Sequence, residues 1–167
     1  MLHGSRAGDV RALPWPDASF DIVVTRFSFH HFQHPLGALR EMTRVCRPGG
    51  RVVVVDMYAS QEKAKAEAWN RLEVLRDPSH VRALSLDELT GLFRGAGLPE
   101  PEVGLYDLRG EVRSLLARSF PLPGDAERIT AMFAAQAERD SMGIEVRREG
   151  EALHYAYRVA LLAATRS

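Results

Sequence analysis

The chain has 167 residues, which is enough for one domain with a hydrophobic core of its own. Its 22 lysines and arginines balance 22 aspartates and glutamates, so no net charge draws it to nucleic acid or to an anionic membrane. One cysteine excludes an intramolecular disulfide, and there is neither a charged-then-apolar leader nor an apolar run of about 18 residues. We therefore expect a cytoplasmic protein with no membrane span and no nucleic-acid partner.

Residues 1–19 are predicted to form an N-terminal arm and a loop. Pro14 and Pro16 restrict the backbone on either side of Trp15, and Asp17 and Ser19 favour turns. Trp15 is expected to cover a hydrophobic edge, with the lining of a ligand pocket as the alternative.

Residues 20–56 are predicted to form a strand, a helix and a second strand. The runs 21–25 (Asp-Ile-Val-Val-Thr) and 51–56 (Arg-Val-Val-Val-Val-Asp) are short and β-branched, which is typical of strands covered on both faces of a parallel sheet. Between them Pro35 begins a helix that extends to Arg47, and Gly49 and Gly50 follow where a left-handed cap is needed. A unit of this length is a right-handed βαβ crossover, so the predicted fold class is α/β.

Residues 26–34 leave the first strand as a loop rich in aromatic and imidazole side chains, namely Phe27, Phe29, His30, His31, Phe32 and His34. Ligands of open α/β sheets bind beyond the carboxyl ends of the strands. Aromatic faces attract cations, and histidine can act as a general base near neutral pH. Alternatively the phenylalanines pack the loop onto the sheet, and we expect at least two of them to do so. No metal is expected, because no carboxylate or thiolate stands nearby in the sequence.

Residues 57–141 are predicted to contain helices and one strand. The first helix covers 58–76, with Trp69 on its apolar stripe, and a second helix starts at a capping box of Ser85 and Glu88 and ends at Gly97. A strand over 102–108 and helices over 112–120 and 125–139 follow. Residues 142–167 are predicted to form a hairpin of strands 143–149 and 152–165, the second of which enters the sheet antiparallel. Cys46 is expected to be buried and inert.

The first fifty residues contain five spaced motifs: Gly8-Asp9-Val10, residues 13–21 (Leu-Pro-Trp-Pro-Asp-Ala-Ser-Phe-Asp), His30-His31, Leu39-Arg40-Glu41 and residues 44–50 (Arg-Val-Cys-Arg-Pro-Gly-Gly). In this order they resemble the class I S-adenosylmethionine-dependent methyltransferases, most closely the ubiquinone/menaquinone-biosynthesis type. The resemblance implies S-adenosylmethionine as cofactor, a small-molecule methyl acceptor and a Rossmann-like sheet of strand order 3-2-1-4-5-7-6. No residue pattern names the acceptor or the atom that is methylated.

The family also has a glycine-rich loop and an acidic strand end that precede these motifs, and this sequence contains neither. The resemblance therefore describes a single, truncated methyltransferase domain without strands 1 and 2. Because those parts hold the amino-acid end and the ribose of the cofactor, we expect these residues to bind S-adenosylmethionine weakly or not at all.

The resemblance assigns four residues to the cofactor. Asp9 would accept a hydrogen bond from the adenine amino group, and Val10 would pack on the adenine ring. Arg26 and Phe27 would border the methionine end. For Asp9 and Val10 the alternative is a solvated arm.

Five further residues are candidates for catalysis and for contact with the acceptor. His30 and His31 are the candidate general bases, and Phe29, Asp56 and Tyr58 are the candidate substrate contacts. Asp56 could instead simply end its strand, and Tyr58, like Trp69, could pack in the core.

Without strands 1 and 2, residues Asp21–Thr25 would form an apolar edge strand, which is an association site. We therefore expect a symmetric homodimer through this strand, or an exchange of the N-terminal arm. Two functions compete: methyl transfer, and a non-catalytic α/β module that self-associates through the edge. A hydrolase that uses His31 with Asp56 lacks an identifiable nucleophile.

Overall fold

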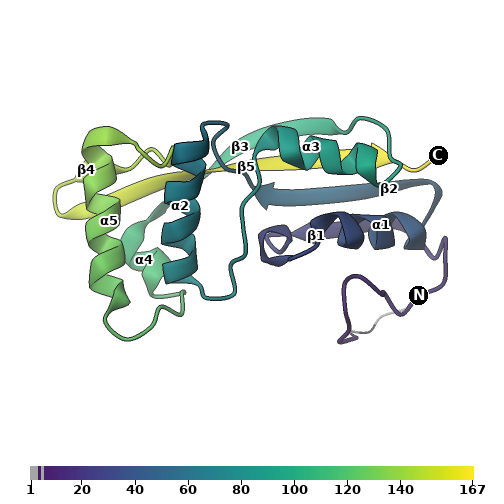
Figure 1. Cartoon of the computed structure of the whole chain (residues 1–167), viewed down its shortest axis with the longest axis horizontal. Helices are drawn as coiled ribbons and strands as arrows, with labels where there is room; N and C mark the ends of the chain where they lie inside the picture. The colour runs from purple at the N-terminus through teal and green to yellow at the C-terminus, as the bar shows by residue number, and fades with distance from the viewer. Residues whose placement is uncertain (1–3, 5) are drawn as a thin grey trace.

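The computed structural model describes residue 4 and residues 6–167 and forms a five-stranded sheet flanked by helices (Figure 1). Strands β1 (Phe20–Arg26) and β2 (Cys46–Met57) pair in parallel, with Val23 opposite Val52. Helix α1 (Pro35–Val45) connects them and has proline at its start. The predicted βαβ unit and the α/β fold class are therefore confirmed. Residues 1–3 and 5 of the predicted N-terminal arm lie outside the described residues.

The C-terminal strand is inserted into the sheet as the resemblance implies. Strand β5 (Ala152–Thr165) pairs antiparallel with β2, and β3 (Glu102–Glu111) pairs antiparallel with the other edge of β5. The resulting order β1-β2-β5-β3 matches the 4-5-7-6 end of the family sheet, and the short β4 (Arg147–Glu149) also pairs with β5.

Helices gather at both ends of an elongated molecule. Figure 1 shows α1 and α3 (Leu86–Gly95) along one end, and α2 (Lys63–Arg76), α4 (Val112–Leu116) and α5 (Asp125–Arg139) at the other. The predicted capping box begins α3: the Glu88 amide donates to the Ser85 hydroxyl at 3.3 Å, and the Ser85 amide donates to the Glu88 carboxylate at 2.8 Å. None of the helices in the described residues is both long and apolar enough to cross a membrane.

Strand β5 contributes to two separate hydrophobic clusters. Over its C-terminal half, Ala160, Leu162 and Ala164 pack with side chains of α1, β2 and α3. Over its N-terminal half, Leu153, Tyr155 and Tyr157 pack with side chains of α2, α5 and the segment before β4. This one long strand therefore ties the βαβ unit to the helical end of the molecule.

The two glycines after α1 lie within strand β2 and do not cap the helix, as the sequence had predicted they would. The helix ends at Val45, two residues short of the prediction, and β2 already begins at Cys46. Gly49 has a φ of +75° and its amide bonds to the carbonyl oxygen of Arg166 at 2.8 Å. Gly50 has no room for a side chain, because a Cβ there would lie 2.7 Å from the carbonyl oxygen of Asp21. The register between β1 and β2 shifts at this point.

Four other predicted boundaries were wrong, the first two of them because local hydrogen bonds hold the chain in other conformations. The helix predicted from residue 58 begins at Lys63, since the amides of Tyr58 and Ala59 bond to the carbonyls of Arg158 and Leu84. Residues 143–146 are not in a strand, because the Asp140 carboxylate accepts the amides of residues 144 and 145. The helix predicted over 112–120 ends at Leu116, and β3 extends three residues beyond its predicted end.

One side of the sheet near β1 carries exposed apolar side chains. Ile22 and Val24 are 60% and 56% exposed, and alternation and register place them on the same side as Leu161, which is 41% exposed. The opposite side of β2 is buried: Val52 and Val54 are 0% exposed beneath the first cluster. Such a surface is a candidate for association.

Candidate functional site

The loop rich in imidazoles forms a tight turn at the carboxyl ends of the two parallel strands. Phe27 leaves β1 with a φ of +50°, and its amide still bonds to the carbonyl oxygen of Val55 in β2 at 2.9 Å. A 3-10 turn, η1 (Phe29–His31), follows directly. A residue other than glycine rarely adopts left-handed backbone angles, so the contacts around Phe27 must enforce this conformation. The turn therefore lies at the edge where the sequence predicted the site.

Asp56 anchors this turn with both carboxylate oxygens. Its Oδ2 accepts the amides of Phe29 at 2.6 Å and His30 at 3.2 Å. Its Oδ1 accepts the Met57 amide at 2.7 Å and lies 2.6 Å from Nδ1 of His30. Since Oδ1 is an acceptor, Nδ1 carries the proton and Nε2 of His30 is the basic nitrogen. Asp56 and His30 are only 1% and 5% exposed, so this pair is an internal support of the turn.

His31 is held from a different segment and stays half-buried. Its Nδ1 donates to the carbonyl oxygen of Ser79 at 2.9 Å. The Ser79 hydroxyl lies 3.1 Å from the same nitrogen and itself donates to Asp77 at 2.6 Å. Nε2 of His31 is therefore the nitrogen that can accept a proton.

His80 is a buried histidine that sequence reasoning did not assign to the site. Its Nε2 donates to the Asn70 carbonyl oxygen at 2.8 Å, since that oxygen also accepts the Ala83 amide at 2.7 Å. Burial lowers the pKa of His80 to about 4 from 6.5, so it is neutral at pH 7. The ring lies 5.4 Å from that of His30, centroid to centroid. No local signal links His80 to His30, because only the tertiary fold brings them together.

Val10 lies beside the imidazole turn. A hollow of about 180 Å³ is bordered by Val10 and Arg11 on one side and by residues 31–34 on the other. Asp9 is next to it, and its carboxylate accepts two Arg11 side-chain nitrogens, the shorter contact being 2.7 Å. The Arg11 guanidinium lowers the pKa of Asp9 to about 2, so Asp9 remains a hydrogen-bond acceptor at neutral pH.

The remaining predicted site residues differ in their access to this edge. Arg26 stacks over the Phe27 ring, 4.5 Å from Cζ to the ring centroid, and Phe27 is half-buried. Phe29 is 3% exposed and packs in the first cluster, as does the partly buried Tyr58. Their predicted roles in cofactor and substrate contact stay predictions.

Four expectations about packing are confirmed. Phe29 is buried and Phe32 packs against the first cluster, so two of the three phenylalanines hold the loop on the sheet. Trp69 is 1% exposed in the second cluster. Cys46 is fully buried, and burial raises the pKa of its thiol. Trp15 packs edge-on against Phe20, with ring centroids 5.4 Å apart. Within residues 6–167, no three His, Cys, Asp or Glu side chains converge in a way that could hold a metal.

Comparison with known proteins points to one family. The model of the methyltransferase domain matches residues 3–54. YcgJ of Bacillus subtilis, named as an uncharacterized methyltransferase, is 35% identical over 158 residues, which cover 93% of this chain and 62% of YcgJ. The crystal structure of YcgJ superposes with a TM-score of 0.85 at 29% identity, over 95% of this chain and 69% of that one.

Two relatives of named activity match shorter segments. The 27-O-demethylrifamycin SV methyltransferase of Amycolatopsis mediterranei is 41% identical over 96 residues, or 56% of this chain and 34% of that protein. The ubiquinone/menaquinone biosynthesis C-methyltransferase UbiE of Laribacter hongkongensis is 33% identical over 86 residues, or 52% of this chain and 32% of that protein. The chain thus spans about three fifths of the length of YcgJ and about a third of the other two.

Proposed function

Because the chain belongs to the class I S-adenosylmethionine-dependent methyltransferases, we propose that it takes part in methyl transfer to a small organic molecule. The observation that carries the proposal is the position of the imidazole turn at the carboxyl edge of the parallel pair β1–β2, beside Val10. The rifamycin and ubiquinone/menaquinone relatives support an acceptor of small-molecule type.

The described residues fit one wall of a cofactor site. In the hollow next to the turn, Val10 would pack on the adenine ring, and the ionised Asp9 would accept a hydrogen bond from the adenine amino group. Arg26 and Phe27 would border the methionine end. S-adenosylmethionine, when bound, supplies an electrophilic methyl carbon.

We assign different roles to the two neighbouring histidines. His31 is half-buried and has Nε2 available, so it is the residue that would take a proton from the acceptor as the acceptor attacks. His30 is buried and bonded to Asp56, so both act as positioning residues that fix the turn on which His31 sits. In this assignment Asp56 does not contact the acceptor.

Binding of S-adenosylhomocysteine, followed by nuclear magnetic resonance, tests the cofactor site. We expect shifts confined to Asp9, Val10 and residues 26–34, and a dissociation constant in the millimolar range. Binding is expected to be this weak because Asp9, Val10 and residues 26–34 do not supply the polar contacts of a glycine-rich loop, which are worth about 1 kcal/mol each. The Asp9→Ala variant should lose the shifts and the Asp107→Ala variant, which changes a surface carboxylate of β3, should keep them. Shifts centred elsewhere would overturn the site, and micromolar affinity would overturn the expected weakness.

A specific observation also supports the second candidate function, self-association. Ile22 and Val24 are more than half exposed on β1, the strand that ends the sheet in the described residues. We propose that two copies associate through β1 as a homodimer, whether or not the chain transfers methyl groups.

A further inference from the structure

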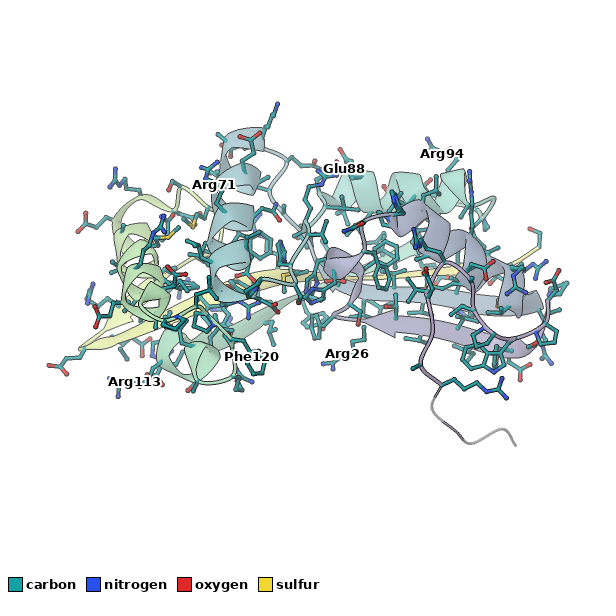
Figure 2. All side chains as sticks on the ribbon, turned by 60° about the horizontal axis from the view of Figure 1, so that its bottom comes forward. Arg26, Arg71, Glu88, Arg94, Arg113 and Phe120 are labelled. Atoms are coloured by element: carbon teal, nitrogen blue, oxygen red, sulfur yellow. The ribbon has the colours of Figure 1, made fainter. Side chains whose placement is uncertain are left out.

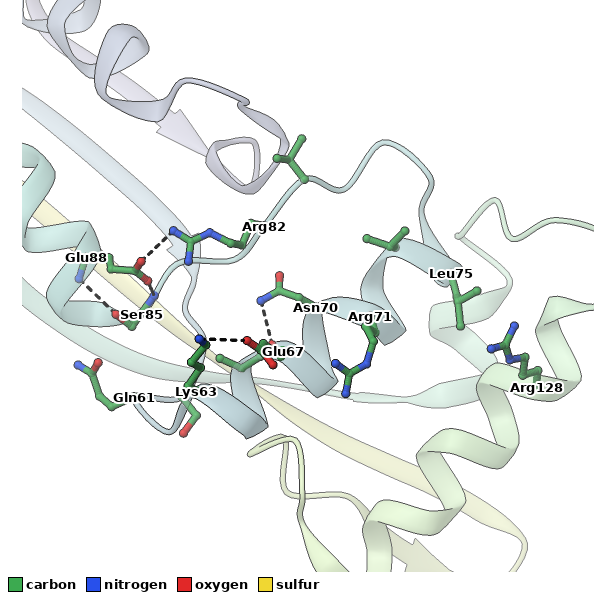
Figure 3. A pocket seen from close by; sticks show the side chains of 14 residues that line it. Gln61, Lys63, Glu67, Asn70, Arg71, Leu75, Arg82, Ser85, Glu88 and Arg128 are labelled. Atoms are coloured by element: carbon green, nitrogen blue, oxygen red, sulfur yellow. Dashed lines mark hydrogen bonds and ion pairs between the residues drawn. The ribbon is translucent and has the colours of Figure 1, made fainter.

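A groove of about 820 Å³ lies between α2, the loop 81–85, the start of α3 and Arg128 of α5, and it shares no lining residue with the hollow beside Val10 (Figure 3). Its apolar part includes Ala66, Val74, Leu75 and Val81, of which Val74 and Val81 are 45% and 41% exposed. Figure 2 shows Arg71 and Glu88, which line the groove, at the opposite edge of the molecule from Arg26 at the end of β1. The volume suits a small molecule.

The charges that line this groove favour an anion. Four cationic side chains, Lys63, Arg71, Arg82 and Arg128, face two acidic ones, Glu67 and Glu88. Arg82 pairs with Glu88 at 2.8 Å, and Lys63 lies 3.8 Å from Glu67, so these four largely compensate one another.

Of the other two arginines, Arg71 is the uncompensated one. Among residues 6–167 no acidic side chain lies within 4 Å of the Arg71 guanidinium, and Arg128 has only Asp125, at 3.9 Å. The two arginines come from the facing helices α2 and α5 and border the same groove (Figure 3). A guanidinium binds carboxylate or phosphate through two parallel hydrogen bonds, so Arg71 is the group with which an anion in the groove would pair.

The groove shares a wall with the turn that carries His31. The amides of Val81 and Arg82 both donate to the carbonyl oxygen of His30 at 3.0 Å. A molecule that contacts Val81 therefore touches the loop on which η1 rests, without entering the hollow beside Val10.

We propose that this groove is a second small-molecule site that binds an amphipathic anion. The apolar body lies along Val74, Leu75 and Val81, and the carboxylate or phosphate pairs with Arg71. The site does not depend on the methyl-transfer reaction, and its ligand need not be the methyl acceptor.

Calorimetric titration with four probes that share a ten-carbon chain tests the site: decanoate, decyl phosphate, decanol and decyltrimethylammonium. The two anions should bind at least tenfold more tightly than the alcohol or the cation, because only they pair with Arg71. A preference for decyl phosphate over decanoate would identify phosphorylated ligands as the natural class, and the reverse would identify carboxylic acids.

Two variants and a control make the test decisive. Arg71→Ala should weaken binding of the anions at least tenfold and leave decanol unchanged, and Val74→Asp should weaken binding of all anionic probes and of decanol. Arg113→Ala removes an 84% exposed arginine on α4, outside the groove, and should change nothing. Both groove positions are exposed, so all three variants should fold. Equal binding of decanol and decanoate, or anion binding that survives Arg71→Ala, would overturn the proposal.

Discussion

Replacement of Asp56 by asparagine tests whether this carboxylate holds the imidazole turn. The substitution keeps the size of the side chain and exchanges one oxygen for an NH2 group. In the native protein the two oxygens together receive four hydrogen bonds, from three backbone amides and from Nδ1 of His30. An asparagine has only one oxygen, so at least one donor that is buried in the native structure must lose its acceptor.

The cost depends on which way the amide points. If its NH2 group faces Phe29 and His30, two buried backbone amides are unsatisfied, at about 1–3 kcal/mol each. If it faces Met57, one backbone amide is unsatisfied, and His30 can move its proton to Nε2 and accept from the NH2 group. We therefore expect the free energy of unfolding to fall by about 2–4 kcal/mol.

Urea unfolding followed by tryptophan fluorescence measures this loss, and imidazole nitrogen shifts report the tautomer of His30. Asp107→Asn is the matched control, because the Asp107 carboxylate is 39% exposed and bonds to Arg109 on the surface. That control should change stability by less than about 0.5 kcal/mol. The reasoning is refuted if Asp56→Asn is as stable as the control, or if native His30 carries its proton on Nε2.

Three further predictions concern other parts of the fold. The free energy of unfolding should fall by up to about 3 kcal/mol as pH drops from 6.5 towards 4, because His80 is protonated in the unfolded chain but stays neutral in the folded one, where its pKa is about 4. His80→Gln should flatten this part of the curve of stability against pH, and an unchanged curve would contradict the assignment. Gly50→Ala should destabilise by about 1–3 kcal/mol in thermal unfolding, whereas Gly91→Ala, with open space around it inside α3, should stabilise slightly; equal effects would disprove the close approach. Light scattering at micromolar concentration should find a dimer that Val24→Lys converts to a monomer, and a monomeric native protein would end the association proposal.

The parts of the fold that follow from short-range patterns were predictable. Val52–Val55 and Ile22–Val24 are β-branched runs whose strand character needs no knowledge of their neighbours, and the capping box at Ser85 is complete within four residues. The glycines after α1 show the limit. The local sequence predicted that Gly49 and Gly50 cap the helix, but both lie within β2, and the need for glycine at position 50 arises from the Asp21 carbonyl on the adjacent strand.

The candidate site likewise has a part that the sequence predicts and a part that only the tertiary fold brings together. The cluster of imidazoles and the Asp56 strand end stand out in the sequence, and the βαβ topology alone brings them to one edge. The supports from Ser79 and His80 do not stand out, since they come from a loop whose sequence suggests only a helix break. Similarly, the groove beside Arg71 depends on α2, the loop 81–85, α3 and α5, which no sequence pattern relates to one another.

Burial is what separates the two adjacent histidines, which are equivalent in the sequence. An imidazole that is 5% exposed and bonded to a buried carboxylate cannot reach an acceptor without breaking the contacts that order the turn. His31 is instead held at Nδ1 by the carbonyl oxygen of Ser79 and is only partly buried. If methyl transfer by this family member needs a base, loss of His31 should therefore reduce turnover while leaving stability nearly intact, and loss of His30 should reduce both. A His30→Ala variant that folds with native stability would remove the structural distinction on which this assignment of roles depends.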